Sequence, residues 1–105
     1  MYLPKVYQQF QDRFPEVFNN FKQLGIATRE AGPLDEKTQD LIKLGIAAGA
    51  NSRGGVMSNT RKAIAAGATV EEVEHAVLLA MTTTGFPNTI AALSWVQEVV
   101  TETDR

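Results

Sequence analysis

Between Leu41 and Ala50, the only polar residue is Lys43. A segment this apolar over nearly three helical turns is typical of a helix that is buried on most sides. Gly45 and Gly49 lie on one face of it, and each costs roughly 1 kcal/mol relative to alanine in a helix. We therefore expect the two glycines to allow another backbone to approach closely, and we predict that this segment is the central helix of the fold.

Capping signals place this helix in a helical hairpin. Asp35 is predicted to be its N-cap, and Ser52 is predicted to cap the helix that follows. Gly67 is the expected left-handed residue at the end of that second helix. The segment Thr69–Glu72 has the pattern of a capping box, which predicts the start of a further helix.

Apolar residues at helical spacing predict helices on both sides of this hairpin. Two are expected before it, from Pro4 to about Gln11 and from Pro15 to Ala31. One long helix is expected from Val70 to about Thr84, and a last helix begins at Pro87 after a break. No window alternates as a strand would. The sequence therefore predicts an all-α fold, a small antiparallel bundle of about five to six helices, in a single domain spanning residues 1–105.

Composition excludes several classes of function. The 105 residues include no cysteine, which excludes disulfides, thiol catalysis and thiolate metal sites in this chain. The net charge is −2 and the basic residues are dispersed, so nothing predicts nucleic-acid binding. No apolar run reaches the ~18 residues of a membrane span, and no segment has the order of a signal peptide. We expect a cytoplasmic protein that does not bind a membrane.

Several motifs resemble the carboxymuconolactone decarboxylase and alkylhydroperoxidase D-like family. They are Leu34–Lys37, Asp40–Ile42, Ser52–Asn59 and Lys62–Val73, and the resemblance covers about residues 34–92. The Ala-Gly-Ala-Thr segment with its following Glu-Glu pair is the most specific part. The resemblance implies an alkylhydroperoxidase D-like fold.

In the redox branch of that family, the turn carries Cys-x-x-Cys-x-x-x-His, with an acidic residue about three helical turns upstream. Those positions fall here on Ser52, Gly55 and Asn59, with the acid on Asp40. The redox motif is therefore absent, which implies that the disulfide-based peroxidase chemistry of the family is absent too.

The candidate site residues gather around this turn. Asp40 is the candidate catalytic residue, either as an acid or base or, in the alternative reading, only as an ion-pair partner of Lys43 or a neighbouring arginine. Backbone amides at a helix start bind anions. We expect neither a metal site nor an organic cofactor. The candidate ligand-binding residues are Ser52, Arg53, Gly54, Gly55 and Asn59.

His75 is the single histidine, one helical turn after Glu71. It could act as a general base or a ligand, or lie on the helix surface or in an interface, paired with Glu71. The second reading is favoured because an isolated imidazole has no second ligand at a suitable spacing. The resemblance gives His75 no role.

Two functions of different class fit these residues. In the first, the protein resembles the decarboxylase side of the family and acts without a cofactor on a small carboxylate or lactone, with Asp40 as the proton carrier. In the second, it is a non-catalytic oligomeric binding or scaffold protein of the same fold. In both, broad apolar faces on the first two helices and the last one predict a homo-oligomer, and the resemblance suggests a trimer or hexamer.

Overall fold

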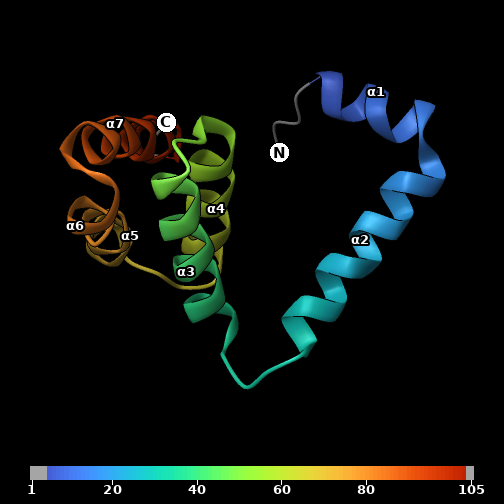
Figure 1. Ribbon diagram of the computed structural model, residues 1–105, viewed down its shortest axis with the longest axis horizontal. Coiled ribbons are helices and arrows are strands. Elements are labelled where there is room, and N and C mark those ends of the chain that lie inside the picture. The colour runs from blue at the N-terminus through green and yellow to red at the C-terminus, as the bar shows by residue number, and fades with distance from the viewer. Residues whose placement is uncertain (1–4, 104–105) are drawn as a thin grey trace. The chain divides into compact units, whose positions relative to one another are not determined.

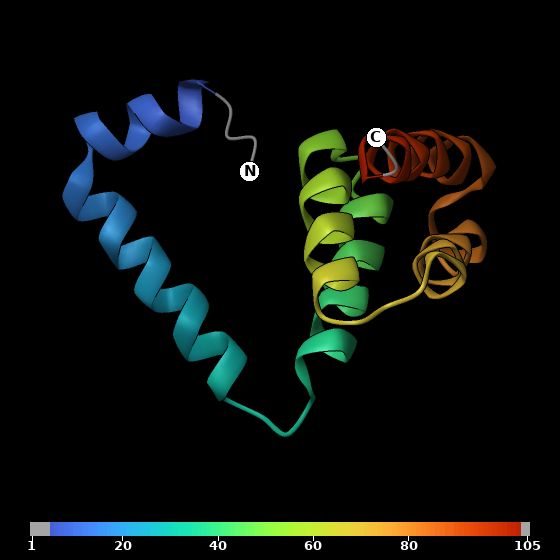
Figure 2. The same ribbon diagram turned by 180° about the vertical axis from the view of Figure 1, so that it is seen from behind.

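The structure is a computed structural model that describes residues 5–103. Within this range it contains seven helices and no strand, which confirms the all-α prediction. By its internal contacts the chain divides into two compact units, Met1–Pro33 and Leu34–Arg105. Figure 1 labels the helices of each unit, and Figure 2 shows the same ribbon from behind. The expected single domain over residues 1–105 stays a prediction.

The first unit consists of α1 (Lys5–Arg13) and α2 (Pro15–Glu30). Pro15 begins α2 as predicted, whereas Pro4, the expected start of the first helix, lies outside the described residues. The ring of Phe18 meets the ring of Tyr7 edge to face, with their centroids 5.7 Å apart. Phe18 is the only buried side chain among the described residues of this unit. Large apolar side chains therefore stay exposed on both helices, among them Val6, Phe14, Val17, Phe21 and Leu24.

The second unit begins with the predicted hairpin, formed by α3 (Glu36–Gly49) and α4 (Arg53–Ala65). Asp35 caps α3 by accepting a hydrogen bond of 2.8 Å from the Thr38 amide. Gly67 has the expected positive φ of 101° after α4. α3 packs against α4, α5 and α7, but Ile42 and Ile46 stay exposed, so the helix is not buried on most sides as predicted.

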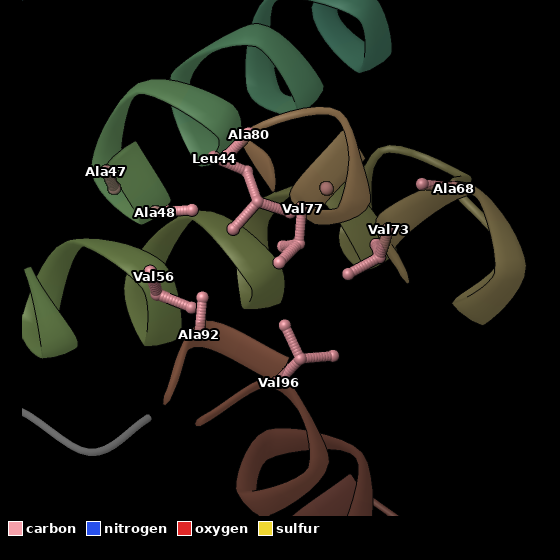
Figure 3. Packing of buried hydrophobic residues seen from close by; sticks show 11 residues of the cluster. Leu44, Ala47, Ala48, Val56, Ala68, Val73, Val77, Ala80, Ala92 and Val96 are labelled. Carbon is pink, nitrogen blue, oxygen red and sulfur yellow. The ribbon is translucent and has the colours of Figure 1, made fainter. Parts of the chain in front are cut away.

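Small aliphatic side chains make up the core of the second unit. Figure 3 shows side chains from α3, α4, α5 and α7 converging between these helices. Small side chains allow the helix axes to approach, and each valine that is fully buried contributes roughly 1.5–3 kcal/mol. The buried core includes Leu44, Ala48, Val56, Val73, Val77, Ala92 and Val96.

The prediction of one long helix from Val70 to Thr84 is wrong. The segment forms α5 (Val70–Leu78) and the short α6 (Met81–Thr84), with a turn between them. In this turn the Ala80 amide donates to the Val77 carbonyl at 3.0 Å, a bond three residues long instead of four. The tighter turn interrupts the α-helical ladder.

The last helix, α7 (Phe86–Thr103), follows Gly85, whose φ is 104°. A positive φ is available to glycine without a steric penalty, so the chain can change direction there. Across the described part of the chain, no helix has both the length and the apolar character that a membrane span requires.

Candidate functional site

The predicted turn joins α3 to α4, and Ser52 caps α4 as expected. The Ser52 Oγ accepts a hydrogen bond of 3.1 Å from the Gly55 amide, and the Ser52 carbonyl accepts one of 2.9 Å from the Val56 amide. The amides of Arg53 and Gly54 have no acceptor within residues 5–103, and both residues are exposed. Two amides at the positive end of the α4 dipole are therefore open to an anion.

Gly55 is tightly packed, whereas Gly54 has open space around it. A Cβ atom added at Gly55 would lie 2.9 Å from the Ser52 Oγ and 3.0 Å from the Ala47 Cβ. At Gly54 a Cβ atom would meet nothing within 4 Å. Of the two glycines, only Gly55 is thus needed for the close approach of α4 to α3.

Arg53 and Asn59 are both engaged by the fold. The Arg53 Nη2 lies 3.0 Å from the Glu98 Oε2, so the exposed guanidinium links the start of α4 to α7. The Asn59 Nδ2 donates to the Gly55 carbonyl at 2.9 Å. This bond connects Asn59 to the turn along one face of α4, and Asn59 itself is half-buried.

Asp40 lies on α3 with only 1% of its surface exposed, and it has an interaction partner in the fold. It shares the face of α3 that carries Ala47, the residue next to Gly55. With a rise of 1.5 Å per residue, Asp40 is about 10 Å along the hairpin from the level of Gly55, and Asn59 is about 6 Å from Gly55 in the same direction. The turn, Asn59 and Asp40 therefore form a row along the α3–α4 interface.

A groove with a volume of about 720 Å³ lies on another side of α3, where that helix faces α5 and α6. Its lining includes the small residues Gly45, Gly49, Ala76 and Ala80. A Cβ atom added at Gly45 would lie 3.6 Å from the Ala76 carbonyl oxygen, and one at Gly49 would lie 3.3 Å from the Thr84 Cγ2. The contact at Gly45 is an ordinary one and the tighter contact at Gly49 is with a side chain, so the expected close approach of another backbone is not confirmed at either glycine. The other lining residues used below are Ile42, Ile46, Leu79, Thr38, Glu72 and His75.

Glu72 and His75 supply polar atoms to this groove. The Glu72 carboxylate accepts a hydrogen bond of 2.9 Å from the Thr69 amide and lies 3.0 Å from the Lys37 Nζ. The bond from the Thr69 amide and then the one from Lys37 hold the pKa of Glu72 below its ordinary value. The Thr69 and Glu72 bonds also confirm the capping box.

The structure describes His75 as an exposed helix-surface residue, as the favoured reading expected. The expected pair with Glu71 is not formed, because the His75 imidazole has no ion-pair or hydrogen-bond partner among the described residues. His75 instead lines the groove. Sequence reasoning missed this groove, although Gly45 and Gly49 were predicted to share one face of α3.

None of the predicted site residues lines the groove, since Asp40 and the turn belong to the α3–α4 side. In residues 5–103, no group of three or more His, Asp or Glu side chains is placed to hold a metal ion.

Comparison with known proteins agrees with the all-α fold. The model of the carboxymuconolactone decarboxylase family matches residues 15–98. A search of curated proteins gives no significant match. Among solved structures, a Burkholderia xenovorans LB400 protein provisionally assigned as a carboxymuconolactone decarboxylase superposes with a TM-score of 0.75. The two sequences are 24% identical, and the match covers 97% of this chain and 83% of that chain. At this identity the likeness concerns the fold.

Proposed function

Because this chain belongs to the carboxymuconolactone decarboxylase family, we propose that it binds a small carboxylate, or a lactone carrying one, at the start of α4. In this proposal it acts on that molecule without a thiol, a metal or an organic cofactor. The single observation that carries the proposal is the pair of open amides at Arg53 and Gly54, held in place by the Ser52 cap.

The roles of the turn residues follow from their contacts. The two open amides receive the carboxylate, and the Arg53 guanidinium beside them would add positive charge only by leaving its ion pair with Glu98. An anion at a helix start gains roughly 0.3–1 kcal/mol when it is exposed and up to about 2 kcal/mol when it is partly buried. Binding is therefore weak unless the rest of the molecule also makes contact. Asn59 extends the polar surface from the turn into the α3–α4 interface.

Asp40 is the proposed proton carrier. When a carboxylate leaves as carbon dioxide, the electron pair of the broken carbon–carbon bond remains on the substrate and takes up a proton. The row from the turn through Asn59 to Asp40 requires a molecule that extends along this interface. The proposal thus favours substrates whose anchoring anion and reacting carbon are at opposite ends, such as dicarboxylates.

The thiol peroxidase reaction of the redox branch is lost in this proposal. Disulfide exchange needs a thiolate, and the chain has no cysteine. The crowding at Gly55 supports the same reading, because a side chain at the second cysteine position would collide with Ser52 and Ala47.

A second candidate function is a non-catalytic oligomeric binding or scaffold protein of the same fold. The distance of about 10 Å along the hairpin between Asp40 and the level of Gly55 favours it, because only a molecule long enough to span that distance could contact both. The exposed apolar side chains of α1 and α2 favour it as well, since such surfaces are typical of contacts with another protein chain. We propose a homo-oligomer, a trimer or hexamer, for either function.

NMR titration of the whole protein with small mono- and dicarboxylates tests the first function. We expect amide shifts centred on Arg53 and Gly54 at millimolar ligand, weakened in Ser52→Ala, which releases the cap. Asp40→Asn should bind an inert carboxylate as well as the wild type does, or better, because it removes a like charge. Shifts confined to regions remote from residues 53–59, or no shifts at all, would count against the site and favour the scaffold function.

A further inference from the structure

We propose that the groove between α3 and α5–α6 is a second ligand site, separate from the turn, for a small, mainly apolar and uncharged molecule with one hydrogen-bonding group. This proposal does not depend on the carboxylate site, because the two sites share no residue and lie on different sides of α3.

The size and lining of the groove fit a small molecule. Its volume of about 720 Å³ falls within the roughly 300–1,000 Å³ typical of ligand pockets. Such pockets combine apolar walls with a few polar groups that orient the ligand. Here Ile42, Ile46 and Leu79 supply apolar surface, and Leu79 is 64% exposed. A ligand in the groove would remove this apolar surface from water.

The depth of the groove comes from glycines that the fold keeps at a cost in helix stability. Gly45 lies beside the Ala76 carbonyl and Gly49 lies beside the Thr84 side chain, so no side chain of α3 fills the groove at these two positions. Larger residues at these two positions of α3 would fill the recess. A flat face for another helix would not need such a recess.

The charges around the groove select an uncharged ligand. Glu72 is the only acidic residue that lines the groove, and no lysine or arginine lines it. Lys37 already pairs with the Glu72 carboxylate, so no free cation faces the groove. A carboxylate ligand would therefore give up its hydration in the groove and find no unpaired cation to replace it. An uncharged alcohol or carbonyl group would lose less on leaving water.

His75 is the residue that would orient the ligand. Its imidazole can donate one hydrogen bond and accept another when neutral. Because no described residue satisfies it, a hydroxyl group on the ligand can do so without breaking an existing bond. The Thr38 side chain also lines the groove.

A matched pair of ligands tests the proposal, namely phenylpropanol and phenylpropanoate, which share the apolar part and differ in the charged group. In NMR titrations of the full chain, we expect the alcohol to shift the amides of Gly45, Gly49 and Ala76. We expect the carboxylate to bind there at least several-fold more weakly. Equal or tighter binding of the carboxylate in the groove would overturn the charge argument.

Two charge-adding variants locate the binding. Leu79→Glu places a carboxylate in the groove and should abolish the alcohol shifts. Ile90→Glu makes the same change at a residue that is 48% exposed on α7 and outside the groove, and it should leave them unchanged. His75→Ala should weaken the alcohol and leave a hydrocarbon analogue unaffected. If the alcohol does not shift the groove amides, and Leu79→Glu lowers the oligomeric mass instead, the groove is a contact between copies of the chain and the proposal fails.

Discussion

Replacing each glycine of the turn by alanine gives a sharp test of the packing described here. At a helical position that can accept alanine, this change stabilises a protein by about 0.4–1 kcal/mol, because it restricts the unfolded chain. Gly54→Ala should gain this amount, since its new methyl group would meet nothing within 4 Å.

Gly55→Ala should have the opposite effect. The new methyl group would lie 2.9 Å from the Ser52 Oγ and 3.0 Å from the Ala47 Cβ. Displacing the cap hydroxyl costs about 1 kcal/mol, and crowding the Ala47 methyl adds about 1 kcal/mol at the low end of overpacking effects. After the alanine gain, the variant should be about 1 kcal/mol less stable than the wild type.

The two variants should therefore differ by about 2 kcal/mol in the free energy of unfolding. Urea unfolding followed by far-UV circular dichroism, at one fixed protein concentration, measures this difference. If Gly55→Ala proves as stable as Gly54→Ala, the turn is not packed against Ala47 and Ser52 as described. The presence of glycine at Gly55, where the redox branch has its second cysteine, would then need another explanation.

Three further predictions address redox chemistry, assembly and pH. The protein should not consume hydroperoxide above the no-protein rate in a coupled assay with a dithiol reductant, because it has no thiolate. Light scattering at micromolar concentration should return the mass of an oligomer, and a monomer mass would refute the proposed assembly. Because the pKa of Glu72 is lowered in the folded state, its stabilising contribution is present above the ordinary value of 4.5 and is lost as the pH falls below it. Unfolding measured from neutral pH into this acidic range should show a shallower loss of stability in Glu72→Gln, and an unchanged slope would contradict the assigned hydrogen bonds.

Local signals predicted most of the second unit. The caps at Asp35 and Ser52 and the left-handed Gly67 depend on backbone geometry within a few residues, so they can be recognised from the sequence alone. The break between α5 and α6 could not be recognised from the sequence, because Leu79 and Ala80 continue a good helical pattern. The tighter turn between α5 and α6 depends on how the chain enters α7, which is a property of the tertiary structure.

The candidate site was predictable only in part. The resemblance pointed to the turn and to Asp40, and the row along the α3–α4 interface relates them in space. The groove depends on the pairing of α3 with α5 and α6, which lie about 30 residues apart in the sequence. No local pattern specifies this pairing, although the glycines on α3 and Ala76 on α5 were visible in the sequence.

The most direct test of the central claim compares the wild type and Asp40→Asn on a series of small dicarboxylates and lactone carboxylates, measuring amide shifts and carbon dioxide release in parallel. The account predicts that both proteins show shifts at Arg53 and Gly54 and that only the wild type releases carbon dioxide above the uncatalysed rate. Release at the same rate by Asp40→Asn, or no shift at the start of α4 in either protein, would contradict it.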